Sequence, residues 1–344
     1  MNKSVFIRSA QQISFQQPLS NEWMSSPIFT TQSLVKSLNP QFKDYLSPLE
    51  ARRMGGLQKR ALVATLKVLK ECNLEHPDAI ITGTALGNLI CTEQFLESMI
   101  ENGEQMLSPT HFMQSTHNTI GSALAIYTHN HGYNTTYCHS QMSFDLALQD
   151  ALMQMDLGKI SNALVGAFEE IEDGYFGLLQ KSGYIGVHGM DPCSEVTVSM
   201  LLTSIAEKEN LCRIAGMCIC RPQGIDDLVE QLDAMLQKAG ANRTTISAIL
   251  SGKNSNPSCD NYYNELLDTL FPKVPTLKYK QIFGENFTAS AFGLYCAANC
   301  LKENYIPEFL YDPCRNLRCN EISNILLVNQ ERGKDYSFIL VQKI

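Results

Sequence analysis

The stretch DAIITGTALGN at residues 78–88 predicts a short buried strand that runs into a turn with glycine at positions 83 and 87. A second stretch, ISAILSG at residues 246–252, has the same order of apolar residues followed by glycine. Each is followed by a helical pattern, at 92–101 and 264–271, and then by a helix of small residues, at 118–129 and 288–300. The repeated order predicts two similar halves, residues 1–207 and 208–344.

The rest of the chain has the same alternation of short strands and helices. Helices are predicted at residues 55–73 and 143–155, and strands at 1–8, 134–138, 162–168, 325–329 and 337–341. Short strands that alternate with helices indicate an α/β protein with a largely buried sheet.

The composition excludes several classes of protein. Of the 344 residues, 44% are hydrophobic and 18% are charged, which suffices for a substantial core and argues against disorder. A net charge of −8 makes nucleic acid a poor partner. No apolar run reaches the roughly 18 residues of a membrane helix. The twelve cysteines contain no C-x-x-C pair, so we expect a soluble, reduced, cytoplasmic protein whose thiols act as small hydrophobic groups.

Cys138 is the candidate nucleophile among these cysteines. It stands in Thr136-Tyr137-Cys138-His139-Ser140, where a predicted strand ends shortly before a helix. Free N–H groups and the dipole at a helix start favour a thiolate, so the position predicts a lowered pKa for this thiol. The alternative is a structural cysteine, because cysteine is among the most buried residue types.

These segments, in this order, resemble the β-ketoacyl synthases, the condensing enzymes of fatty-acid and polyketide assembly. The resemblance runs from about Arg52 to the end and rests on five segments: Arg53-Met54-Gly55, GTALGN at 83–88, Ser108-Pro109 with Asn118-Thr119-Ile120-Gly121, TYCHS at 136–140 and ALVGAFEE at 163–170. It implies a thiolase-like, five-layer αβαβα fold built from two duplicated halves, in which Cys138 occupies the position of the nucleophile.

The second half departs from the family. Ketosynthases use one histidine in an H-G-T-G-T turn and another in an N-I-G-H motif to polarise malonyl and to stabilise its enolate. Here the first turn has Lys253 and Asn254 without histidine, and the second has Glu285 in place of the histidine. Lys280 matches the lysine that opens the second motif, while Glu331-Arg332-Gly333-Lys334 replaces a Gly-Phe-Gly-Gly turn. A carboxylate repels a developing enolate, so we expect decarboxylation to be lost.

This pattern resembles the chain-length factors of type II systems and the short ketosynthase-like proteins of aryl-polyene and flexirubin-type pigment clusters. The resemblance implies two partners, an acyl carrier protein and a catalytic ketosynthase, with the ketosynthase joined in a heterodimer through the strand near 134–138. It implies no cofactor. Three functions remain open: a non-condensing partner of a ketosynthase, an acyltransferase or ketosynthase that uses Cys138 with other bases, and a scaffold with a structural Cys138.

Other polar residues near these motifs are weaker candidates for site residues. The resemblance places His117 and Asn118 near the substrate pocket, whereas His139 neighbours Cys138 on a strand and should point to the opposite face. Glu285 either is solvated or pairs with Lys253 or Lys280 in the old cavity. The acidic residues at 169–173 read as a charged loop. A metal at His129-x-His131 is rejected because no third ligand is in view.

Overall fold

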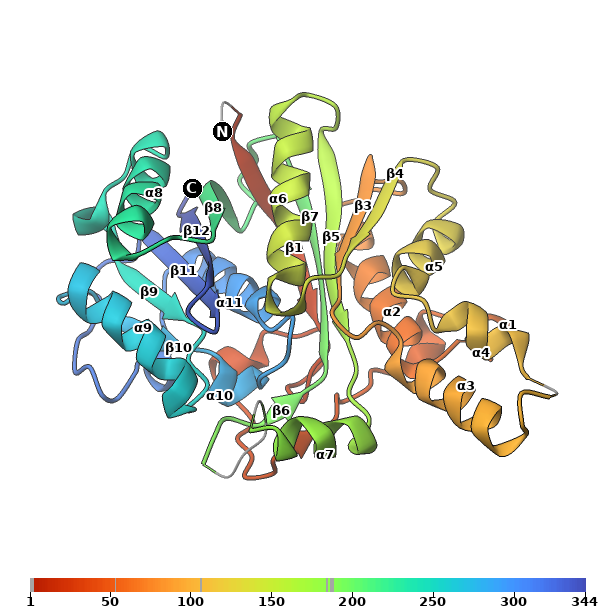
Figure 1. Cartoon of the computed structure of the whole chain (residues 1–344). Helices are drawn as coiled ribbons and strands as arrows, with labels where there is room; N and C mark the ends of the chain where they lie inside the picture. Colours follow the sequence, from red (N-terminus) through yellow and green to blue (C-terminus); the bar gives the residue numbers. More distant parts are fainter. Residues whose placement is uncertain (1–2, 53, 106, 184, 186–188) are drawn as a thin grey trace.

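The computed structural model describes residues 3–344 except 53, 106, 184 and 186–188, so the predicted motif residue Arg53 lies outside the described residues. Its main element is one ten-stranded sheet in the order β10-β9-β11-β12-β8-β1-β7-β5-β3-β4 (Figure 1). The strands are β1 (Val5–Gln12), β3 (Ala79–Gly83), β4 (Tyr133–Tyr137), β5 (Asn162–Glu169), β7 (Val196–Thr203), β8 (Cys212–Cys220), β9 (Ala248–Ser251), β10 (Thr276–Lys278), β11 (Asn324–Glu331) and β12 (Asp335–Gln342). A separate parallel pair joins β2 (Leu34–Val35) to β6 (Cys193–Ser194).

The sheet consists of two groups of five strands with the same pattern of pairing. In the first group β4, β3 and β5 pair in parallel, and β7 and β1 follow antiparallel. In the second, β10, β9 and β11 pair in parallel, and β12 and β8 follow antiparallel. A short antiparallel pairing of β1 with β8, at Val5–Ile214, joins the groups. The exact boundary at residue 207 stays a prediction.

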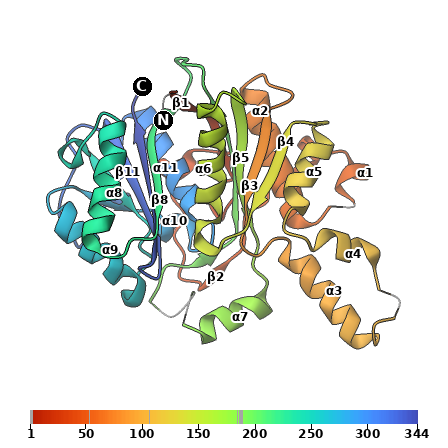
Figure 2. The same cartoon turned by 45° about the horizontal axis from the view of Figure 1, so that its top comes forward.

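Helices cover each group on both faces. Helices α6 (Ser143–Asp156) and α11 (Ser290–Glu303) contact each other and share one apolar core with the inner faces of both groups. Helices α2 (Gly56–Glu71) and α5 (Thr119–Tyr127) cover the outer face of the first group. Helices α8 (Ile225–Lys238) and α9 (Pro257–Leu270) cover the second (Figure 2). The order is five layers, αβαβα.

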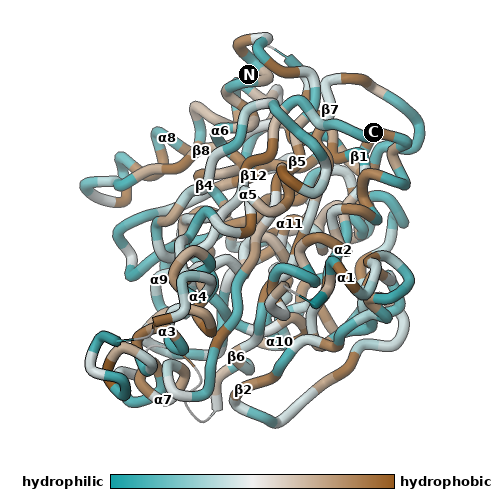
Figure 3. Tube along the Cα trace, turned by 90° about the vertical axis from the view of Figure 1, so that its right-hand side faces the viewer, coloured by the Kyte–Doolittle hydropathy of each residue, from teal (hydrophilic) through white to brown (hydrophobic). Residues whose placement is uncertain are grey.

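The alternation of side chains along the strands explains this layering. On β5, Ala163, Val165 and Ala167 face the central core, while Leu164 and Phe168 face α2 and α5. Successive side chains of a strand point to opposite faces, so a strand covered on both faces is apolar throughout. Figure 3 shows that the hydrophobic segments gather in the sheet and in α11.

Small residues allow α11 to lie in the centre of the molecule. Every residue from Ser290 to Leu301 is buried. At Gly293 a Cβ atom would lie 2.7 Å from Cδ1 of Leu327 on β11, so the helix approaches the sheet more closely than any larger residue would permit. The small-residue pattern of 288–300 therefore reflects packing.

Several elements differ from the sequence-based expectation. Strands β7 and β8 and helix α8 were not predicted, and β7 is buried at every position, including Thr197 and Ser199 between its apolar residues. Helix α9 begins at Pro257 and not at residue 264, because the Asn256 side chain accepts from the Ser258 N–H and caps the helix. The remaining helices are α1 (Pro48–Ala51), α3 (Leu89–Glu101), α4 (Pro109–Gln114), α7 (Asp173–Lys181) and α10 (Lys280–Phe283). None of the helices in the described ranges is long and apolar enough to cross a membrane.

Candidate functional site

Cys138 lies beyond the carboxyl ends of the parallel strands β3 and β4, where α/β folds bind their ligands. Its thiol is solvent-exposed and donates to the carbonyl oxygen of Ala85, with Sγ 3.5 Å from the oxygen. Ala85 belongs to the predicted glycine turn, residues 83–88. The same turn is fastened to the strand before the cysteine, because the Thr84 N–H donates to the Tyr137 carbonyl at 3.0 Å.

The predicted strand–cysteine–turn–helix arrangement is present, and we call residues 138–143 the elbow. Ser140 has a φ of +47°, uncommon for a residue with a side chain, and begins a short 3-10 helix that leads into α6. Ser143 closes the elbow: its hydroxyl accepts from the His139 N–H at 2.8 Å and donates to the Ser140 carbonyl at 2.7 Å. Both contacts fix the backbone directly after Cys138.

The predicted lowering of the Cys138 pKa is wrong. Burial raises the pKa of this thiol, and the nearby carboxylate of Glu169 raises it further. The nearest N–H of the elbow, that of His139, is bound by the Ser143 hydroxyl and so is not free to stabilise a thiolate. Burial of the thiol, together with the Glu169 charge, therefore outweighs the effect of the helix start on its pKa.

The prediction of a charged loop at residues 169–173 is wrong for its first two members. Glu169 is the last residue of β5, and both it and Glu170 are buried. Oε1 of Glu169 accepts hydrogen bonds from the N–H groups of Ala85 and Leu86, at 2.7 and 3.2 Å, and from the Thr84 hydroxyl. Burial raises the pKa of Glu169 to about 7, against an ordinary value of 4.5.

The residues that replace the two family histidines lie in direct contact. Oε2 of Glu285 is 2.7 Å from Nζ of Lys280 and 2.6 Å from Nδ2 of Asn254, and all three residues are buried. We call these three the Glu285 network. Of the two lysines suggested for Glu285 the structure selects Lys280, since Nζ of Lys253 lies 3.0 Å from Asp312 instead. A solvated Glu285 is excluded by its burial.

A cavity of about 390 Å³ lies between the elbow and the Glu285 network. Gln141 of the elbow, Asn254 and Arg332 are among its lining residues. The turn at 331–334 touches the elbow, because the Ser140 hydroxyl donates to the Glu331 carboxylate at 2.7 Å. Of the predicted site residues only Asn254 lines this cavity, so Cys138 and Glu285 lie outside its lining.

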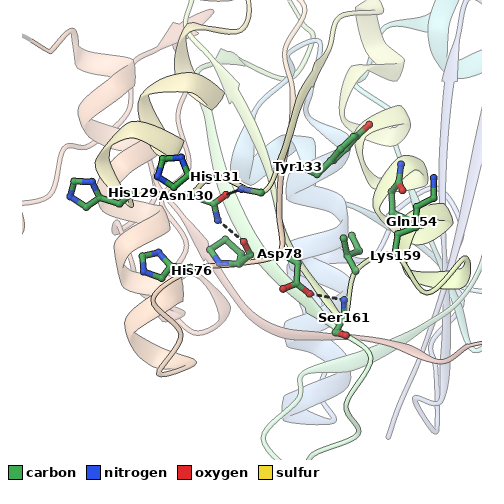
Figure 4. Close-up of a pocket in the computed structure, with 12 residues that line it drawn as sticks. His76, Asp78, His129, Asn130, His131, Tyr133, Gln154, Lys159 and Ser161 are labelled. Carbon is green, nitrogen blue, oxygen red and sulfur yellow. Dashed lines mark hydrogen bonds between the residues drawn. The ribbon is translucent and has the colours of Figure 1, made fainter.

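A larger cavity, about 870 Å³, lies at the opposite ends of β3 and β4 (Figure 4). His76, His129 and His131 line it, but none of the predicted site residues does. Asp78 accepts there from the Ser161 N–H at 2.7 Å, a contact that fixes a loop. The described residues include no group of three metal-binding side chains there or elsewhere.

The two remaining candidates differ in position. His117 borders the glycine turn, since a Cβ atom at Gly87 would lie 3.2 Å from the His117 Cα and 3.4 Å from its ring. It therefore flanks the turn that Cys138 contacts. Asn118 precedes α5, donates to the Ser122 hydroxyl at 3.4 Å and lines an open groove beside Thr135 on β4.

Comparisons with known proteins identify the fold and the family. The model of the beta-ketoacyl synthase N-terminal domain matches residues 21–223, and no curated protein sequence matches the chain. The ishigamide ketosynthase/chain length factor superposes with a TM-score of 0.85 at 15% identity, over 100% of both chains. The ketosynthase ApeO in complex with its chain length factor ApeC from Xenorhabdus doucetiae gives 0.79 at 12%, over 99% of this chain and 98% of the other.

A third solved structure, the type II polyketide synthase complex AntDE:AntF of a carrier protein with its ketosynthase, gives a TM-score of 0.78 at 13% identity, over 100% of both chains. These similarities confirm the predicted thiolase-like fold. The family model covers more than half of the sequence, from residue 21, after β1, to residue 223, after β8, and includes the elbow and Glu169. The chain belongs to the beta-ketoacyl synthase family.

Proposed function

We propose that the chain is a chain-length-factor-like subunit that assists a catalytic ketosynthase in type II fatty-acid or polyketide assembly without condensing substrates itself. The Glu285 network carries this proposal. Both histidine positions are replaced, and the replacements hold each other in the interior. In the proposal, residues 1–207 supply Cys138 and residues 208–344 supply the network.

The chemistry of the network opposes decarboxylation. A ketosynthase needs two neutral donors aimed at the malonyl carbonyl, because negative charge develops there. The Asn254 amide and the Lys280 ammonium donate to Glu285, and are directed at that carboxylate. Lys253 is bound to Asp312. The remaining carboxylate oxygen of Glu285 adds negative charge at the position where decarboxylation needs an electron-withdrawing group.

The β4 edge of the sheet supports a partner of the same fold. β4 ends the sheet and pairs on one side with β3 in the described structure. Exposed apolar side chains flank it, namely Phe112, Met113, Ile126 and Tyr133. Figure 3 views this side, with α5 beside β4 and with α4 next to α3 further along. An unpaired strand edge bordered by apolar groups favours pairing with a second chain. We therefore propose a heterodimer with a ketosynthase and, in the same assembly, contact with an acyl carrier protein.

Replacing Ile126 by aspartate is expected to weaken this heterodimer at least about tenfold in Kd, since a charge would be buried against an apolar partner. Ile126 is 75% exposed, so the free subunit should fold normally. Ile225 on α8, 42% exposed on the opposite flank, provides the matched control Ile225→Asp. Native mass spectrometry of the chain, co-purified with a ketosynthase encoded by a neighbouring gene, measures the heterodimer formed by each variant. A stable homodimer formed without that ketosynthase would count against the proposal.

A second candidate function, acyl transfer through Cys138, is favoured by the exposed thiol and the intact elbow. Acyl transfer needs a nucleophile but neither histidine. Cys138→Ala is expected to abolish acylation by an acyl-carrier protein and to leave heterodimer assembly unchanged. Intact-protein mass spectrometry detects the adduct, with Cys314→Ala as a control at another exposed thiol. If wild-type protein gives no adduct, the scaffold function with a structural Cys138 is favoured.

The proposed function is tested by reconstitution with malonyl-carrier protein. The neighbouring ketosynthase alone, this chain alone and the two together are compared for product formation. We expect product of defined chain length only with both subunits. Equal product from the ketosynthase alone would contradict a chain-length role.

A further inference from the structure

A continuous set of contacts leads from the interior to the Cys138 thiol. Glu169 holds the backbone N–H groups of Ala85 and Leu86, and the carbonyl of Ala85 accepts from the thiol. Thr84 contributes twice, since its hydroxyl donates to Glu169 and accepts from the Gly87 N–H at 2.9 Å. One carboxylate oxygen thus fixes three successive residues of the turn on which the thiol rests.

The other oxygen of this carboxylate is unusual. Oε2 of Glu169 is buried and has no hydrogen-bond partner among the described residues. The buried cation Arg60 pairs with other carboxylates, because it lies 3.3 Å from Glu195 and 4.0 Å from Glu170. A buried carboxylate that no cation neutralises is costly to ionise. The hydrogen bonds that Glu169 accepts from the turn have to offset this cost.

We propose that Glu169 is the positioning residue of Cys138. Glu169 holds the turn under the thiol, and its own protonation state sets the reactivity of the thiol. The role rests on Cys138 being the reactive thiol of the second candidate function, acyl transfer. Glu169 does not contact an acyl group in this proposal. It acts through the carbonyl of Ala85 and through its charge.

The electrostatics give the direction of the effect. The pKa of Glu169 is raised to about 7 by burial, so the group changes charge near neutral pH. When it ionises, its charge raises the pKa of the Cys138 thiol. The other titratable groups facing this region are Glu170, Glu195, Arg60, Lys36, His117 and His139. Burial likewise raises the pKa of Glu170 to about 7, and the charge of Glu170 raises the pKa of Glu169.

The test is the pH profile of alkylation of Cys138 by iodoacetamide, a neutral reagent, read on the Cys138 peptide with Cys314 as internal reference. In wild-type protein the rate should rise less than tenfold per pH unit around pH 7, because ionisation of Glu169 opposes thiolate formation. In Glu169→Gln, whose amide oxygen can still accept from the turn, this inflection should vanish. At pH 8 the variant should react about threefold to tenfold faster, since a shift of half to one pKa unit changes the thiolate fraction by that factor.

Two further variants make the result specific. Glu170→Gln removes a buried carboxylate that binds the Ile90 N–H and not the turn, so the inflection should remain and move to lower pH. Thr84→Val keeps the charge of Glu169 but removes a hydrogen-bond donor that lowers the pKa of Glu169, so the inflection should move to higher pH. This variant also tests the proposal if Glu169→Gln fails to fold.

An inflection that persists in Glu169→Gln would arise from another group, such as Glu170, whose pKa is also raised to about 7, and would overturn the proposal. Identical profiles in wild type and Glu169→Gln, with a reactive Cys138, would remove the role of Glu169 and leave the proposed function intact. A Cys138 that is inert in both proteins would overturn this inference together with acyl transfer through Cys138, and the chain-length role would be judged by the reconstitution alone.

Discussion

The purified chain is expected to release CO₂ from malonyl-carrier protein about 10⁴- to 10⁶-fold more slowly than a ketosynthase that has both histidines. Loss of one donor at such a site costs roughly 10²–10³ in rate, and two are absent here. The resemblance places Lys253 and Asn254 in the region of the first histidine and Glu285 at the second, and Asn254 donates to Glu285 at 2.6 Å. A radiometric CO₂ assay on the isolated chain measures the rate.

The control for this experiment is the same preparation mixed with the neighbouring ketosynthase, which should release CO₂ at the rate of the complex. Integrity of the isolated chain is established by its thermal unfolding. Robust CO₂ release by the chain alone would contradict the non-condensing assignment and would favour the use of other groups as donors.

Replacing Lys280 by methionine is expected to destabilise the protein by about 3–5 kcal/mol, because removal of one partner of a buried ion pair leaves the other charge uncompensated. Both side chains are 3% exposed, so water cannot replace the ammonium at Glu285. Asn254 would remain as the single donor to that oxygen. Urea unfolding followed by circular dichroism gives the free energy of unfolding.

The double variant Lys280→Met/Glu285→Met should recover most of this loss, since no charge is then left in the interior. Lys67→Met is the matched surface control. Lys67 forms an i,i+4 pair with Glu71 at 3.2 Å, with about a third of each side chain exposed, and its removal should cost roughly 0–1 kcal/mol. A loss below about 1 kcal/mol for Lys280→Met would show that the buried pair is not maintained as described.

The architecture was accessible from the sequence because local patterns specify it. The glycine turn after 78–83 and its counterpart after 246–251 both follow buried strands, β3 and β9. The small residues at 288–300 indicated a buried helix, which is α11. β7 was missed although Thr197 and Ser199 alternate with valine along it; these polar residues are buried as well, so the alternation does not mark an exposed face.

The site was predicted only in part, because its contacts are distant in sequence. The pairing of Lys280 with Glu285 spans five residues and is one of the two lysine pairings that the sequence suggests for Glu285. The contact of Asn254 with Glu285 spans 31 residues and depends on the sheet order. The influence of Glu169 on Cys138 depends on the neighbouring strands β3, β4 and β5, so the residues around Cys138 gave the wrong direction for its pKa.

The Glu285 network also constrains how this chain could evolve. A single codon change that returned histidine to position 285 would leave the Lys280 ammonium in the interior without the one carboxylate that it pairs with in the described structure. Such a variant would need a new partner for this ammonium, or a further substitution at Lys280, to avoid an unpaired charge in the interior. If the chain is the non-condensing subunit proposed above, catalysis could therefore return only through several substitutions together, and this dependence would help to preserve a division of labour between the subunits.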